Sequence, residues 1–153
     1  MNLSELLKDV EVKEIIGNPQ LTITGIAFDS RAVKPGNLFV CITGFETDGH
    51  KFAPAAIEQG AAAIIAERDL SDLGVTCVVV ENSRKALAMA SATFYGHPER
   101  SFCLIGVTGT NGKTTTTYLI KSVLEAMGKK VGLIGTIETI IKEKKIPSSN
   151  TTP

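Results

Sequence analysis

The stretch FCLIGVTGTNGKTTTT, residues 102–117, constrains the fold of this chain more than any other part of the sequence. CLIGV is a continuous apolar run, which is typical of a buried parallel strand, and residues from about 114 to 127 have the apolar spacing of an amphipathic helix. Glycines at 109 and 112 separate the two, and a further strand-like run follows at 131–141. A strand, a glycine loop, a helix and a strand in this order predict the opening of a mononucleotide-binding fold.

The loop has the residue types that a bound triphosphate requires. Glycine lets the backbone approach phosphate groups at positive φ angles, and the helix that follows presents the positive end of its dipole. Lys113 has the reach to contact the β- and γ-phosphates, and the Thr114 hydroxyl can bind Mg²⁺. We therefore expect ATP and Mg²⁺ as cofactors, Lys113 and Thr114 as catalytic residues, Thr114 as metal ligand, and an ATP site made of Gly109, Thr110, Asn111, Gly112, Lys113, Thr114 and Thr115.

The loop departs at one position from the strict P-loop pattern. That pattern requires a glycine five places before Gly112, where this chain has Val107. The Gly-Lys-Thr end of the pattern is intact. A glycine-rich turn before a threonine-rich helix start is the alternative interpretation, but it explains neither the lysine nor the apolar run that precedes the loop.

The first part of the chain alternates predicted strands with predicted helices, which indicates an α/β domain. Strands are expected at 21–30, 38–43, 61–67 and 75–82, and helices at 3–10, at 55–60 and at 84–96, the last with Ser83 as its N-cap. The polar stretch HPERSF, residues 97–102, is the expected linker. We therefore predict one domain over residues 1–97 and the start of a second over residues 98–153.

Composition and charge exclude several classes of protein. No apolar run approaches the ~20 residues that span a bilayer, and the N-terminus has no signal pattern, so we expect a cytoplasmic protein without a membrane partner. Residues 97–153 carry 8 Lys and Arg against 4 Asp and Glu, which fits an anionic ligand, but no dense basic stripe indicates nucleic acid. Cys41, Cys77 and Cys103 lie in apolar, strand-like stretches without metal-ligand spacing, so we expect buried, reduced thiols.

The loop GVTGTNGKTTT resembles that of the Mur ligases, the ATP-dependent enzymes that build the peptide stem of bacterial cell-wall precursors. Residues 28–67, FDSRAVKPGNLFVCITGFETDGHKFAPAAIEQGAAAIIAE, resemble the N-terminal substrate domain of the members that add the third stem residue or D-Ala-D-Ala. VGLIGTIET followed by TTP resembles the third-residue-adding members in particular. The resemblance implies a small N-terminal α/β domain that binds UDP, followed by the truncated beginning of a P-loop domain.

The family's substrate residues can be placed on this sequence. The Asp29–Arg31 and Gly44–His50 stretches match those that hold the uridine end of the substrate, which implies contacts from Ser30, Phe45, Glu46 and Thr47. Thr151 and Thr152 match residues that contact the UDP-sugar near its reacting end. Asp48 is also a natural turn residue, and His50 a possible helix start, so both have structural alternatives.

The resemblance implies a reaction and its partners. A Mur ligase of this type joins meso-diaminopimelate or L-lysine to UDP-N-acetylmuramoyl-L-Ala-D-Glu through an acyl phosphate made with ATP. The intact enzyme is expected to be a monomer, and these 153 residues to be its inactive N-terminal part. The alternatives are a D-Ala-D-Ala-adding Mur ligase, a generic P-loop kinase or nucleotide hydrolase, and a UDP-sugar-binding module that does not catalyse.

Overall fold

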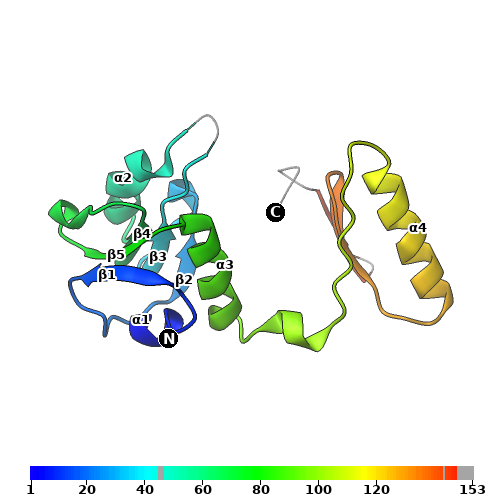
Figure 1. Cartoon of the computed structure of the whole chain (residues 1–153), viewed down its shortest axis with the longest axis horizontal. Coiled ribbons are helices and arrows are strands. Elements are labelled where there is room, and N and C mark those ends of the chain that lie inside the picture. The colour runs from blue at the N-terminus through cyan, green and yellow to red at the C-terminus, as the bar shows by residue number, and fades with distance from the viewer. Residues whose placement is uncertain (45–46, 143, 148–153) are drawn as a thin grey trace. The chain divides into compact units, whose positions relative to one another are not determined.

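The computed structural model describes residues 1–44, 47–142 and 144–147. It divides into two compact units, Met1–Cys103 (unit 1) and Leu104–Pro153 (unit 2), which are coloured blue to green and green to red along the chain in Figure 1. The domain boundary expected after residue 97 lies close to this division and remains a prediction. Over the described residues, no helix is both long enough and apolar enough to cross a membrane.

Unit 1 is built on a five-stranded sheet in the order β1-β5-β4-β3-β2. The strands β2 to β5 are parallel, and each lies beside the next one along the chain, while β1 pairs antiparallel with β5 at the edge. The bounds are β1 (Val12–Ile16), β2 (Gly25–Ala27), β3 (Asn37–Val40), β4 (Ala63–Ala66) and β5 (Thr76–Val80).

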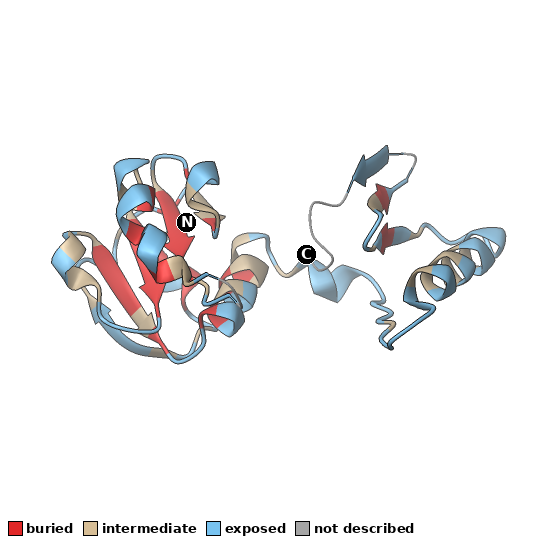
Figure 2. Ribbon diagram, turned by 90° about the horizontal axis from the view of Figure 1, so that it is seen from above, coloured by how far each residue is buried: buried red, intermediate tan, exposed pale blue. Residues whose placement is uncertain are grey.

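The central strands are buried on both faces, because helices cover both faces of the sheet (Figure 2). On one face Leu38, Ile65 and Val78 pack with residues of the helices α1 (Leu3–Leu6) and α3 (Ser83–Phe94). On the other face Phe39 and Ile64 pack with the helix α2 (Ala53–Glu58) and with the segments around the 3-10 turns η1 (Ser30–Ala32) and η3 (Ser71–Leu73). Neighbouring residues of β3 and β4 alternate between these two cores, as the two-residue period of a strand requires.

The described residues of unit 2 form one helix and an antiparallel sheet. The helix α4 (Lys113–Ala126) is followed by β6 (Gly132–Ile134), β7 (Glu138–Ile141) and β8 (Lys144–Pro147), which pair in chain order. Among its described apolar residues only Leu133 and Ile140 are buried. The side of α4 with Leu119, Val123 and Met127 is exposed, so this unit has only a small core of its own.

The α/β class and the predicted helices and strands of unit 1 are confirmed in outline, but three local expectations are wrong. Residues 103–106 are exposed, Val107 is half-buried, and these five residues form no strand, because the strands described in unit 2 pair with one another and leave CLIGV no neighbour. Cys103 is therefore exposed, while Cys41 and Cys77 are buried. The N-cap of α3 is Asn82, whose side chain accepts a hydrogen bond from the Lys85 N–H, and Ser83 is the first helical residue.

Candidate functional site

The predicted uridine residues of unit 1 lie where the parallel strands end, which is the edge at which α/β sheets bind ligands. The chain leaves β2 at Phe28 and enters η1 at Ser30, and it leaves β3 into the segment 41–50. Ser30 is partly exposed, and Phe28 is 58% exposed although it directly follows a strand. Phe28 was not among the predicted residues. The sequence feature that could have indicated Phe28 is its position as an aromatic residue immediately before the Asp-Ser-Arg stretch.

Asp29 fixes the turn that presents Ser30. Its Oδ1 atom accepts a hydrogen bond of 3.0 Å from the Arg31 backbone N–H and another of 3.0 Å from Arg31 Nε, and its Oδ2 atom accepts one of 2.7 Å from Arg31 Nη2. The side-chain hydrogen bond with Arg31 is the main reason that the pKa of Asp29 falls to about 2. Asp29 and Arg31 therefore shape the turn, and Ser30 is left as its ligand-facing candidate.

Backbone hydrogen bonds join residues 42–44 to residues 47–49 after β3. Thr43 and Asp48 form an isolated antiparallel bridge, the Gly44 N–H donates to the Thr47 carbonyl over 2.9 Å, and the Gly49 N–H donates to the Ile42 carbonyl over 2.9 Å. Thr47 is exposed at this turn. Two further predicted contacts, Phe45 and Glu46, lie outside the described residues.

Asp48 and His50 have structural roles in this segment. Asp48 Oδ1 accepts a hydrogen bond from the His50 backbone N–H at 3.0 Å, and His50 Nδ1 lies 2.6 Å from the same oxygen. His50 Nε2 accepts a hydrogen bond of 2.9 Å from the Glu67 N–H, so Nδ1 carries the proton and donates to Asp48. The hydrogen bonds from His50, the backbone one first, lower the pKa of Asp48 to about 2. His50 is buried, so both residues hold the turn.

Glu67 joins the ends of three neighbouring strands at this edge, and the sequence interpretation did not single it out. It directly follows β4, its Oε2 atom accepts from Thr43 Oγ1 at 3.2 Å, and its Oε1 atom accepts from the Ser83 N–H at 2.9 Å. Arg84 Nη2 also donates to the Thr43 carbonyl over 3.1 Å. A charged residue at the end of the apolar run AAAIIA was the only sequence signal for this network.

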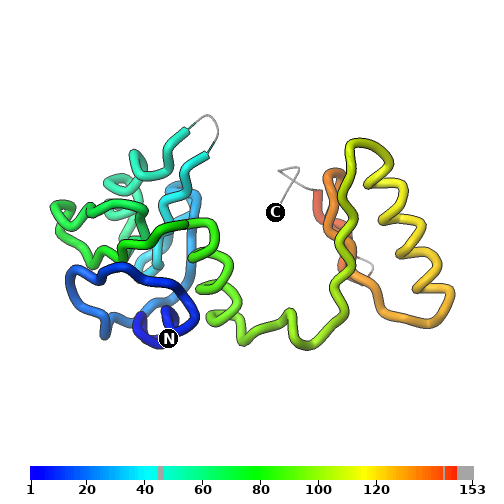
Figure 3. The backbone as a smooth tube through the Cα atoms, in the orientation of Figure 1, coloured from blue at the N-terminus to red at the C-terminus, as the bar shows by residue number. Residues whose placement is uncertain are grey.

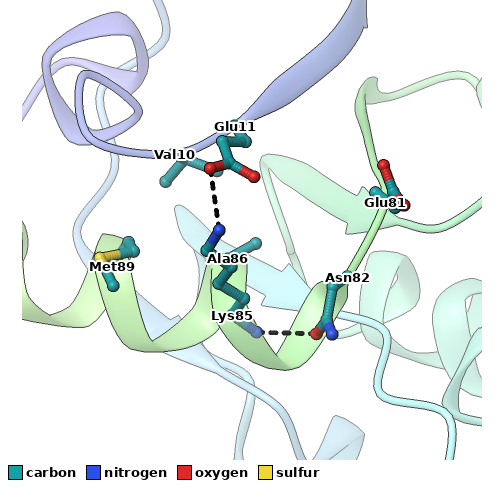
Figure 4. A pocket seen from close by; sticks show the side chains of 7 residues that line it. All are labelled: Val10, Glu11, Glu81, Asn82, Lys85, Ala86 and Met89. Atoms are coloured by element: carbon teal, nitrogen blue, oxygen red, sulfur yellow. Dashed lines mark hydrogen bonds and ion pairs between the residues drawn. The ribbon is translucent and has the colours of Figure 1, made fainter.

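A pocket of about 390 Å³ lies on unit 1 where α3 begins (Figure 4). Lys85 Nζ donates to Glu11 Oε1 over 2.8 Å across it, so two opposite charges at the pocket already neutralise each other. None of the predicted ligand residues lines it; its lining residues are Val10, Glu11, Glu81, Asn82, Lys85, Ala86 and Met89. We therefore assign this pocket no part in the candidate sites.

In unit 2 the glycine loop leads directly into α4, as the tube trace in Figure 3 shows. Gly109 and Gly112 have φ angles of 151° and 76°, the positive values that the sequence predicted for these glycines. A Cβ atom on Gly112 would meet no protein atom within 4 Å, so the space beside the loop is open. No side chain caps the first turn of α4, whose N–H groups point out of the helix end.

Lys113 lies along this loop. Its Nζ atom donates to the Gly109 carbonyl over 2.6 Å and to the Thr110 carbonyl over 3.3 Å. Thr114 is partly exposed on the first turn of α4, and Thr115 is exposed. Open space, glycines at positive φ, an uncapped helix start and a lysine across the loop are what a phosphate chain requires, so the described residues fit the predicted nucleotide site.

A hydrogen bond between side chains joins α4 to its sheet. Tyr118 donates its hydroxyl proton to Glu138 Oε1 over 2.6 Å, and this hydrogen bond raises the pKa of Tyr118. Lys145 Nζ lies 3.6 Å from the same carboxylate. Glu138 of β7 thus contacts both α4 and β8. Thr151 and Thr152, the remaining predicted contacts, lie outside the described residues.

Two family models match the chain in the order of its two units. The Mur ligase family catalytic domain matches residues 22–95, and the Mur ligase middle domain matches residues 107–153. Together with the phosphate loop and the strand-end edge described above, these matches define the class: the chain belongs to the Mur ligase family. The resemblance that the sequence motifs indicated is confirmed.

Within this family the chain is similar to ligases named for 2,6-diaminopimelate. The UDP-N-acetylmuramoyl-L-alanyl-D-glutamate--2,6-diaminopimelate ligases of Alkaliphilus metalliredigens (strain QYMF) and Clostridium botulinum (strain ATCC 19397 / Type A) are 49% and 50% identical to it over 100% of this chain. The chain spans 31% and 32% of the length of these relatives.

Solved structures agree with this placement. A structure of a UDP-N-acetylmuramoyl-L-alanyl-D-glutamate--2,6-diaminopimelate ligase has a TM-score of 0.70 and 26% identity, and covers 100% of this chain and 31% of its own. The MurF ligase from Thermotoga maritima in complex with ADP has a TM-score of 0.51 and 35% identity, over 76% of this chain and 26% of its own.

Proposed function

We propose that this chain supplies the UDP-sugar-binding unit and the phosphate loop of a ligase that joins 2,6-diaminopimelate to UDP-N-acetylmuramoyl-L-alanyl-D-glutamate with ATP. The observation that carries the proposal is the 49% identity, over the whole chain, to a ligase of that name. Both candidate sites lie inside the matched region. The names of the relatives favour 2,6-diaminopimelate over L-lysine as the added residue.

ATP is the nucleotide that the loop of unit 2 fits. In this proposal the N–H groups of residues 109–115 and the positive end of the α4 dipole hold the phosphates, and Lys113 neutralises the oxygens of the transferred group; the uncapped start of α4 and the position of Lys113 along the loop support it. The Thr114 hydroxyl is the ligand that this chain offers to Mg²⁺. Mg²⁺ supplies positive charge where negative charge develops on the phosphate oxygens. The ADP in the Thermotoga maritima MurF structure supports a nucleotide here.

The UDP-sugar is assigned to the strand-end edge of unit 1. Ser30, Thr47 and the exposed ring of Phe28 are the described groups there, and they combine hydroxyl groups for the polar edge of uracil with an apolar face for its ring. Phe45 and Glu46 are proposed as further contacts to the uridine end, and Thr151 and Thr152 of unit 2 as contacts near the reacting end of the UDP-sugar. A cytoplasmic, monomeric enzyme remains part of this proposal.

A D-Ala-D-Ala-adding ligase is the second candidate, and the similarity to MurF structures favours it. The MurF from Acinetobacter baumannii has a TM-score of 0.65 and 27% identity over 82% of this chain. These identities are well below the 49% to the diaminopimelate ligase of Alkaliphilus metalliredigens, so we rank this candidate second.

Calorimetric titration of the chain tests the proposal. UDP-N-acetylmuramoyl-L-alanyl-D-glutamate should bind saturably, UDP should compete with it, and Ser30→Ala should weaken binding about tenfold, the loss typical of one well-placed hydrogen bond. Ser71→Ala is the matched control, because Ser71 lies in η3, before the amino end of β5. Tighter binding of the UDP-muramoyl tripeptide than of the dipeptide would favour the D-Ala-D-Ala-adding alternative. A folded chain that binds neither would contradict the assignment of this edge.

A further inference from the structure

The geometry points to Glu67 as a positioning residue of the UDP-sugar site that does not touch the substrate. Its carboxylate acts through Thr43 and Ser83, while its backbone N–H, which every variant at position 67 keeps, holds His50. The inference rests on the proposed function, since the residues on either side of Thr47 are those that Glu67 holds. Neither of the two predicted uridine-binding stretches, Asp29–Arg31 and Gly44–His50, includes Glu67. What assigns its role is the set of hydrogen bonds that join the end of β4 to both ends of the segment 43–50.

Glu67 holds this segment at two points. At the first point, its carboxylate accepts the Thr43 hydroxyl proton over 3.2 Å, where the chain has just left β3. At the second, its backbone N–H donates to His50 Nε2 over 2.9 Å, and His50 in turn is bound to Asp48. The bridge between Thr43 and Asp48 and the bond from the Gly49 N–H to the Ile42 carbonyl close the turn between these points.

The carboxylate is itself held by the helix that follows β5. Glu67 Oε1 accepts the Ser83 N–H at 2.9 Å on the first turn of α3, where the positive end of the helix dipole favours an anion. Arg84, the next residue of α3, donates to the Thr43 carbonyl over 3.1 Å. The start of α3, the end of β4 and the turn after β3 are therefore fixed relative to one another through a single side chain.

These same contacts argue against Glu67 as a direct ligand of the substrate. Both of its carboxylate oxygens already accept hydrogen bonds from the protein, and a carboxylate repels the diphosphate of a UDP-sugar. The first N–H groups of α3 are also occupied, because the Glu67 carboxylate accepts a hydrogen bond from the Ser83 N–H and the Asn82 side chain accepts one from the Lys85 N–H. The diphosphate is thus excluded from this helix end, and Glu67 acts by holding Thr43 and His50, the described residues on either side of Thr47.

Four variants separate positioning from charge. Glu67→Ala removes both acceptors, whereas Glu67→Gln keeps an oxygen for the Ser83 N–H and turns its NH₂ group to the Thr43 oxygen. Thr43→Val removes the hydroxyl at nearly constant shape, and Thr43→Ser retains it. Glu81→Ala is the control, because its carboxylate is 84% exposed at the same edge and lies 3.9 Å from Lys13.

Titration with UDP-N-acetylmuramoyl-L-alanyl-D-glutamate and amide hydrogen exchange are the two readouts. Glu67→Ala and Thr43→Val should weaken binding about three- to tenfold, as expected for a partly exposed charge-assisted hydrogen bond, while Glu67→Gln, Thr43→Ser and Glu81→Ala stay within about twofold. In the free chain, Glu67→Ala should speed exchange of the Gly49 amide about tenfold and leave Val78 of β5 unchanged.

The two readouts distinguish failure of this inference from failure of the proposed function. If the unaltered chain does not bind the UDP-sugar but the Gly49 amide responds as stated, the site assignment fails and the role of Glu67 in holding the turn stands. If Gly49 exchange is the same in Glu67→Ala as in the unaltered chain, the inference is overturned whatever the ligand does. Equal weakening by Glu67→Ala and Glu67→Gln would also overturn it, because the loss of affinity would then follow the negative charge at position 67 and not its hydrogen bonds to the turn.

Discussion

Substitution of Gly49 by alanine tests how closely the turn after β3 is packed. A Cβ atom at this position would lie 2.5 Å from the Ile42 carbonyl oxygen and 2.7 Å from the Ile42 nitrogen, and both are backbone atoms that cannot rotate away. The turn must therefore open. The Gly49 N–H then loses its 2.9 Å bond to the Ile42 carbonyl, at a cost of about 1 kcal/mol. As His50 moves with it, the Glu67 N–H loses its acceptor, at a cost of about 1–2 kcal/mol more.

Urea unfolding followed by far-ultraviolet circular dichroism measures this loss, since the chain has no tryptophan. Gly49→Ala should lower the free energy of unfolding of unit 1 by about 2–3 kcal/mol, the sum of the two losses. Gly74→Ala is the control. Gly74 has a φ of +77°, and no atom lies within 4 Å of an added Cβ, so this substitution should lower the free energy of unfolding only by the strain of the left-handed backbone, about 1–2 kcal/mol. If Gly49→Ala destabilises no more than Gly74→Ala, the contact with Ile42 does not constrain the turn as described.

Three further outcomes are expected. Hydrogen bonding lowers the pKa of Asp48 to about 2, so the stabilisation from its carboxylate is present above the ordinary value of 3.8 and is lost as the pH falls towards 2. The difference in urea midpoint between the unaltered chain and Asp48→Asn should therefore shrink over that pH range. A constant difference would contradict this. Iodoacetamide at pH 8 should add once to the folded chain, at exposed Cys103, since burial raises the pKa of Cys41 to about 12; a second adduct in the intact mass would show that a buried thiol is reachable. Lys113→Met should weaken ATP binding at least tenfold by calorimetry, while Lys121→Met, which breaks only an ion pair with Glu125 on α4, should not.

The elements that the sequence predicted best are those whose pattern is local. β3, β4 and β5 lie within apolar runs, and their burial on both faces makes those runs continuous. β1 was not predicted, because VKEII carries two charged residues and becomes a strand only by pairing with β5, far along the chain. CLIGV shows the converse: an apolar run is a strand only where another strand accepts its hydrogen bonds.

The same distinction applies to the candidate sites. The phosphate loop could be predicted because its glycines, its lysine and the start of α4 are neighbours in the sequence, and backbone chemistry alone requires them. The role of Glu67 could not, since Thr43 and Ser83 lie 24 and 16 residues from it and meet it only when the sheet has formed. The sequence left two roles for His50, one in holding the local backbone and one in contacting the ligand. The hydrogen bond from the Glu67 N–H to its Nε2 atom favours the first role.

The pairing of β1 with β5 has a consequence for the order of events during synthesis. β1 leaves the ribosome long before its partner β5, because Val12 pairs with Val80, which is synthesised much later. Until then β1 remains soluble through Lys13 and Glu14, while β2, β3 and β4 find neighbours close along the chain. When β5 arrives, β1 covers the outer edge of the segment TCVVV, an apolar strand that would otherwise invite pairing with another chain. The first strand to be made is thus the last to be placed, and it covers the β5 edge of the sheet with a strand that carries charged side chains.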